Sequence, residues 1–199
     1  RGVSPLASCS EANVSYGTNY SIASSCGGGS AYMCQGLAPY AVNSQLAYGY
    51  AATSSNDICG RCYQLQFDGT SHNGGADPGS KALAGKTMIV QAMNIGYDVS
   101  GGQFDILIPG GGVGIYNSCS KQWGVDASEL GAQYGGFLSA CKQQLGYSAS
   151  LDAYKSCVAQ RCNSVFKSRG LNDLAAGCQW FVDWYNVADN PSVKYKEVA

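Results

Sequence analysis

Ten cysteines in a chain of 199 residues constrain its fold more than any other feature of the sequence. The pair Cys59 and Cys62 has zinc-ribbon spacing, but no second Cys-x-x-Cys pair follows, and the single histidine, His72, lies in a polar loop away from it. We therefore expect a disulfide framework and no metal site, which places the protein in an oxidising compartment. The cysteines stand at positions 9, 26, 34, 59, 62, 119, 141, 157, 162 and 178.

Composition and charge exclude several classes of protein. Hydrophobic residues make up 45% of the chain and charged residues 13%, which excludes a disordered chain and suits one domain over residues 1–199. The net charge of -1 and the lack of a basic run argue against a nucleic-acid partner. No apolar stretch approaches the length of a membrane span, and no charged-then-apolar leader stands at the start, so we expect any signal peptide to have been removed. We expect a secreted, extracellular monomer, and two sequons predict glycosylation at Asn13 and Asn19.

Hydrophobic periodicity predicts strands and helices in a mixed order. Alternation predicts strands at 63–68, 103–108, 179–185 and 193–198, and a β-rich run predicts another at 86–93. Helical spacing predicts helices at 42–52, 127–133 and 151–166. Because no regular βαβ repeat appears, we expect a β-dominated α+β domain, a small barrel.

Asp105 is the residue that this pattern marks for chemistry. The single histidine makes a nucleophilic triad a weak hypothesis, and the glycine-rich run at 110–114 lacks the Lys-Ser/Thr of a phosphate loop. Asp105 instead interrupts the apolar strand QFDILI, where burial would raise its pKa and suit a general acid. The alternative is an Asp paired with a backbone group on an open barrel face. Asp98, seven residues earlier in a polar loop, either tunes Asp105 or is simply solvated.

Several segments together resemble glycoside hydrolase family 45. They are SAYMCQGLAPYAVNSQLAYGYAATS, CGRCYQLQF, KTMIVQ, GGQFDILIPGGGVGIYNSC, QYGGFLSAC and GCQWFVDWYNVADNPSVKYKEV, in order over nearly the whole chain. The resemblance implies a six-stranded double-psi β-barrel with peripheral helices and disulfide-held loops, a fold shared with the expansins. It also implies an endo-β-1,4-glucanase that acts on a β-1,4-glucan without a cofactor. Residues 145–171 are the main stretch without a counterpart.

The same resemblance assigns roles to individual residues. Asp105 matches the general acid of an inverting mechanism, and Asp98 matches an auxiliary loop aspartate near the cleavage point. The residues matched to the substrate groove are Tyr40, Tyr134, Gly110, Gly111 and Gly112. Each of the two tyrosines could equally be a residue that packs in the core or at the rim.

The chain departs from the family pattern at both ends. The strand TRYWDCC, whose Asp is the family's general base, and the final Cys-Pro do not occur in it. By resemblance, Cys9 pairs with Cys34, while Cys141, Cys157, Cys162 and Cys178 form two bridges. Cys26, Cys59, Cys62 and Cys119 match cysteines whose partners lie on the absent segments. We expect that the sequence lacks ends of the native molecule, or that these four cysteines pair among themselves.

Three functions compete on this evidence. The first is an endoglucanase that cuts internal β-1,4 bonds. The second is a non-hydrolytic, expansin-like wall-binding protein that keeps the acid and has no base. The third is a disulfide-stabilised secreted binding protein that reuses the groove. The match around Asp105 and Asp98 favours the first.

Overall fold

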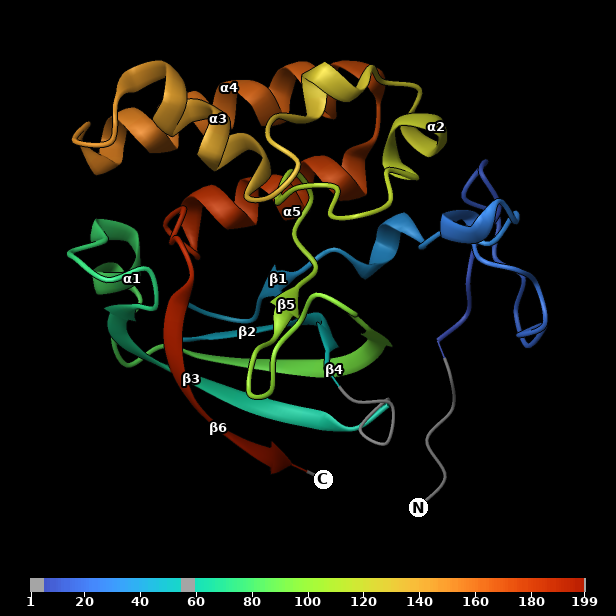
Figure 1. The fold of residues 1–199 in the computed structure, drawn as a ribbon, viewed down its shortest axis with the longest axis horizontal. Coiled ribbons are helices and arrows are strands. Elements are labelled where there is room, and N and C mark those ends of the chain that lie inside the picture. The colour runs from blue at the N-terminus through green and yellow to red at the C-terminus, as the bar shows by residue number, and fades with distance from the viewer. Residues whose placement is uncertain (1–5, 55–59, 199) are drawn as a thin grey trace.

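The chain forms a six-stranded sheet with helices α2 to α5 gathered on one side of it and α1 at one end (Figure 1). A computed structural model describes residues 6–54 and 60–198. The strands in the described residues are β1 (Tyr40–Ala41), β2 (Leu46–Thr53), β3 (Cys62–Ser71), β4 (Thr87–Ile95), β5 (Asp105–Ile106) and β6 (Pro191–Val198). Strands β3, β4 and β6 confirm three of the predicted strands, and the β-rich α+β class is confirmed.

Strand order explains how the two short strands meet the rest of the sheet. The order is β1-β2-β4-β3-β6, with β5 also paired to β2. Only the β2–β4 pair is parallel among the described pairs. Because β4 pairs along the whole of β2, the short strands β1 and β5 both use the opposite edge of β2, one after the other.

The predicted helix at 42–52 is wrong, because this segment is the β1–β2 hairpin. Strand β2 buries its small residues Ala47, Gly49 and Ala51, while Tyr48 faces outward. A Cβ at Gly49 would lie 2.6 Å from Met88 Cε and 3.3 Å from Pro39 Cβ, so a larger residue there would have to displace the Met88 side chain. In this strand the large residues face outward and the small ones face the core, which inverts the usual pattern. The hydrophobic periodicity therefore predicted a helix where a strand forms.

The helices are α1 (Pro78–Ala82), α2 (Cys119–Trp123), α3 (Gly136–Leu145), α4 (Leu151–Val165) and α5 (Asn172–Asp183). The predicted helix at 151–166 is confirmed as α4, and 127–133 contains a short 3-10 helix, Ala127–Leu130. The predicted strand at 179–185 is wrong, because most of it belongs to α5. Trp180, Val182 and Trp184 do alternate, but Phe181 between them is buried as well, as a helix deep in the core allows.

The predicted strand at 103–108 is reduced to the two residues of β5. A turn precedes it, in which Ser100 N donates to Gln103 Oε1 over 2.7 Å. Beyond β5, Leu107 N still donates to Tyr50 O over 2.9 Å before Pro109 ends the pairing. The alternation was nevertheless read correctly, because Phe104, Ile106 and Ile108 pack against the core while Asp105 is exposed.

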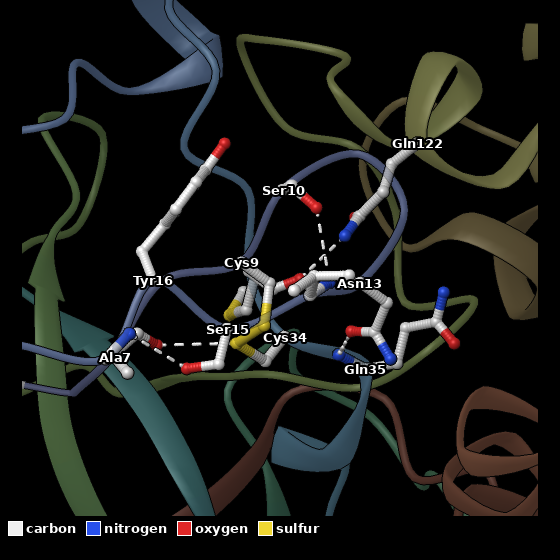
Figure 2. Close-up of a disulfide and its surroundings, with 12 residues drawn as sticks. Ala7, Cys9, Ser10, Asn13, Ser15, Tyr16, Cys34, Gln35 and Gln122 are labelled. Carbon is white, nitrogen blue, oxygen red and sulfur yellow. Dashed lines mark hydrogen bonds between the residues drawn. A yellow bond between two sulfur atoms is a disulfide. The ribbon is translucent and has the colours of Figure 1, made fainter.

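Three disulfides join the described cysteines, one with the expected pairing and two within the expected group of four cysteines. Cys9 pairs with Cys34 in the N-terminal segment, where Figure 2 shows the bridge among the loop residues. Gln122 reaches this segment from α2 and donates to Met33 O over 2.8 Å. The two bridges expected around the insertion are Cys141–Cys157 and Cys162–Cys178.

Three further cysteines are unpaired: Cys26, Cys62 and Cys119. No bridge therefore joins these three cysteines to one another in the described residues. Cys59, the fourth of that group, lies outside the described residues.

Candidate active site

Asp105 lies where β5 meets the edge of β2. Its Cα is paired with that of Ala52, so the two side chains share one face of the sheet. That face is the outer one, because Ala51 next to Ala52 is fully buried in the core. The short strand therefore holds a carboxyl group rigidly at the surface of the sheet.

The electrostatic environment of Asp105 favours its protonated form. Desolvation by its surroundings, and then the charge of Asp98, raise the pKa of Asp105 above its ordinary value. A raised pKa keeps a carboxyl group protonated closer to neutral pH, which is the property that a general acid needs. The shift predicted from the apolar strand is thus present, although Asp105 is exposed and not buried as an interior residue.

Asp105 lines a large cleft with a volume of about 1440 Å³. The cleft brings together most of the residues that the sequence assigned to the site. Those in its lining are Asp98, Asp105, Gly110, Gly111, Gly112 and Tyr134. Tyr40, also assigned to the site, is not part of the lining and lies on β1.

The glycine run fits tightly against the start of α3. Phe137 N donates to Gly110 O over 2.8 Å, and Gly112 forms an isolated bridge with Tyr134. Gly110 has a φ of 86°, and a side chain on it would lie 2.5 Å from the Phe137 ring. The glycines therefore allow backbone to pack on backbone beside the acid, which leaves Tyr134, 59% exposed, on the cleft wall.

Two residues that hold the loops were missed by sequence reasoning. The backbone oxygen of Gln133 accepts from Val113 N over 3.0 Å and from Gly114 N over 3.1 Å. Val99 is buried next to Asp98, and its side chain occupies the space that a side chain at Gly96 would need. The apolar Val99 in an otherwise polar loop was the available signal for this anchor.

Two unpaired thiols also line the cleft. Cys26 Sγ lies 3.6 Å from Ser118 Oγ, which places it beside Cys119 at the start of α2. Burial, and then the nearby Cys26, raise the pKa of the Cys119 thiol to about 11. The Cys119 side chain is therefore a thiol at neutral pH, and its low thiolate fraction makes it a poor nucleophile.

No group of three or more His, Cys, Asp or Glu side chains within residues 6–54 and 60–198 is arranged to hold a metal ion. Over the same ranges, none of the helices is long and apolar enough to span a bilayer.

A carboxyl group with a raised pKa, in a cleft that is also lined by a run of glycines, suits the general acid of a glycoside hydrolase. The chain belongs to glycosyl hydrolase family 45, whose sequence profile matches residues 3–144. The match ends at residue 144. The expectation that 145–171 lacks a counterpart is nevertheless wrong, because two endoglucanases align over 98% of the chain. The match to the family profile includes Asp98, Asp105 and the glycine run.

Known relatives agree with this assignment. Endoglucanase B of Cellvibrio japonicus (strain Ueda107) is 70% identical over 98% of this chain and 38% of its own length. An endoglucanase of the springtail Cryptopygus antarcticus is 34% identical over 98% of this chain and 72% of its own. The chain therefore spans well under half of the bacterial relative.

A solved structure gives the same result for the fold. The crystal structure of the cellulase from Cryptopygus antarcticus superposes with a TM-score of 0.71 at 33% identity. The superposition covers 98% of this chain and 78% of that one.

Proposed function

We propose that this protein is an endo-β-1,4-glucanase that hydrolyses internal bonds of cellulose or related β-glucans with inversion. The observation that carries the proposal is Asp105, a carboxyl group with a raised pKa on the outer face of the sheet in a family 45 cleft. Asp105 acts as the general acid and protonates the glycosidic oxygen as the bond to the leaving sugar breaks.

The neighbouring residues have supporting roles in this proposal. Asp98 raises the proton affinity of Asp105 and closes near the cleavage point. Tyr134 offers a ring to a pyranose in the cleft, and Gly110, Gly111 and Gly112 let the chain approach the backbone. The six strands are proposed to close as the double-psi β-barrel of the family.

Inversion requires a second carboxylate on the far side of the sugar, with room for a water molecule between the two. By resemblance this base is the Asp of TRYWDCC, a motif that the 199 residues do not contain. We propose that the base is carried on such a segment. Support comes from Cys26 and Cys119, which lie unpaired beside each other at the cleft, as cysteines with partners on that segment would.

We also propose that the protein works outside the cell as a monomer with a β-1,4-glucan as its partner. Three disulfides favour an oxidising compartment, and the near-neutral net charge suits a neutral polysaccharide. Asn13 and Asn19 remain proposed glycosylation sites. Asn19 is exposed, whereas the Asn13 side chain is partly buried and accepts from Gln35 N over 2.9 Å.

The decisive experiment compares the protein with its Asp105→Asn variant on carboxymethylcellulose. New reducing ends should form with the native protein, and the variant should lose about 10²- to 10⁴-fold of that activity because it cannot donate a proton. NMR of the first product should show the inverted α-anomer. Binding of glucan with no cleavage by either protein would favour the expansin-like alternative instead.

A second arm tests where the base comes from. Azide can attack the anomeric carbon without a base, so it should accelerate cleavage if the base is not within these residues. If hydrolysis is efficient and azide has no effect, the base lies within the chain.

A further inference from the structure

An exposed pair of tyrosine rings lies on the sheet outside the cleft lining. Tyr40 on β1 and Tyr48 on β2 are direct cross-strand partners, with ring centroids 5.9 Å apart and planes 30° apart. They are 59% and 38% exposed, and Val42, 50% exposed, follows on the same strand end. We call these three residues the tyrosine patch. An apolar surface of this kind is available to a partner.

The register of the strands connects the tyrosine patch to the acid. Partners directly opposite each other share a face, and so do residues two or four apart on one strand. Tyr40, Tyr48, Ala52 and Asp105 therefore project from the same outer face along one edge of β2. Four residues separate Tyr48 from Ala52, so the patch lies about 13 Å from the acid along the strand.

The tyrosine patch is also rigid. The turn between β1 and β2 is closed by Asn43, whose Oδ1 accepts from Gln45 N over 2.8 Å and from Leu46 N over 2.9 Å. The carbonyl of the same residue accepts from Trp184 Nε1 over 2.9 Å, which ties the turn to the core. Rings held on such a hairpin lose little freedom when a ligand binds.

We propose that the tyrosine patch is a remote binding site for the glucan, occupied by the same chain that is cut at Asp105. This inference rests on the proposed function and extends it from the cleft to the outer face of β2. Stacking on flat, uncharged sugar rings suits exposed tyrosines, and the direct path along one strand edge gives one chain access to both places. Tyr48, which the sequence placed in a helix, is the new element of the site.

A remote site should matter only for chains long enough to reach it. In Tyr48→Leu the contact with Tyr40 stays apolar but the flat ring is lost. We expect kcat/KM for cellohexaose to fall about threefold to tenfold, the range given by loss of one aromatic contact. Cleavage of a short oligosaccharide that does not extend beyond the cleft should change by less than twofold. Tyr48→Phe, which keeps the ring, should behave as the native protein.

The control variant is Tyr147→Leu, which removes a tyrosine of 80% exposure that follows α3. It should leave both substrates unaffected. An equal loss on long and short substrates in Tyr48→Leu, or a loss in Tyr147→Leu as large, would overturn the proposal.

Binding separates this inference from the hydrolytic function. Calorimetry with cellohexaose compares Asp105→Asn with the double variant Asp105→Asn/Tyr48→Leu, so no cleavage intervenes. Weaker binding by the double variant supports the patch even if the native protein proves unable to hydrolyse glucan. The proposed role of the tyrosine patch would be refuted by any of three results: unchanged binding by the double variant, no glucan binding at all, or a dimer that only Tyr48→Leu dissociates.

Discussion

The helical layer and the cleft loops are stabilised by different means. In the helical layer, disulfides join α3 to α4 and α4 to α5, and large aromatic residues such as Phe137 and Phe166 are fully buried. The cleft loops at 96–114 carry no disulfide and depend on glycines with positive φ and on backbone hydrogen bonds. Stability is thus concentrated in one region and chemistry in the other, so substitutions should affect the two separately.

Gly136 is where the two regions meet, so it offers the largest test. It begins α3 with a φ of 47°, and a Cβ on it would clash with the carbonyl oxygen of Gly110 and lie 2.5 Å from Gly112 N. In Gly136→Ala the left-handed backbone costs roughly 1–3 kcal/mol and the clash adds to it. We expect the free energy of unfolding to fall by more than about 3 kcal/mol and hydrolysis by more than tenfold.

The control for this substitution is Gly114→Ala in the cleft loop that α3 packs against. Its φ is 63°, yet nothing lies within 4 Å of the added Cβ, so only the backbone cost applies. Denaturant unfolding and carboxymethylcellulose hydrolysis report both effects. If the two variants behave alike, packing of the glycine run on α3 is not what shapes the cleft.

Removal of the Cys162–Cys178 bridge tests the helical layer alone. The bridge spans 16 residues, and a loop of that size gives about 3 kcal/mol of stabilisation. In the Cys162→Ala/Cys178→Ala variant the melting temperature should fall by several degrees, while kcat/KM at low temperature stays within about twofold. Calorimetry and activity are measured on the same sample. A proportionate loss of activity well below the melting point would show that the two regions are coupled.

Most of the residues that the sequence assigned to one site lie in one cleft, and Tyr40 is the exception. Asp105, Asp98, Tyr134 and the glycine run were placed in one site, and the structure puts them in one cleft. Local signals marked Asp105, a charge in an apolar strand, and its loop neighbour Asp98, whereas Tyr134 and the glycine run entered the site only through the family resemblance. The Cys9–Cys34 disulfide was assigned by resemblance and is present. The two bridges expected among Cys141, Cys157, Cys162 and Cys178 are also present, although their pairing was not predicted.

The errors arose where tertiary packing overrode the local pattern. Strand β2 buries Ala47 and Gly49 and exposes Tyr48, which periodicity alone cannot anticipate. In α5 the spacing of Leu174, Cys178 and Phe181 is helical, but the alternation of its last residues was read in its place. The tyrosine patch was missed for the same reason, because it depends on the pairing of β1 with β2.

The smallest expected effect comes from Asp98. Its charge raises the pKa of Asp105, but it contributes less to this shift than desolvation does. Asp98→Asn removes this second cause and leaves the first, so the pKa of Asp105 should fall but stay above its ordinary value. Because a general acid works only when protonated, the alkaline limb of kcat/KM should move to lower pH. The shift should be less than about one pH unit, since the interaction between exposed carboxylates is weak.

Asp152→Asn on α4 serves as the matched control, because it removes an exposed carboxylate from the first turn of a helix in the other region. Its pH profile should coincide with that of the native protein. An unmoved alkaline limb in Asp98→Asn would mean that the walls of the cleft alone set the acidity of Asp105. A limb that moves to higher pH would contradict the sign of the interaction, because loss of a negative neighbour cannot make a carboxyl group hold its proton more tightly.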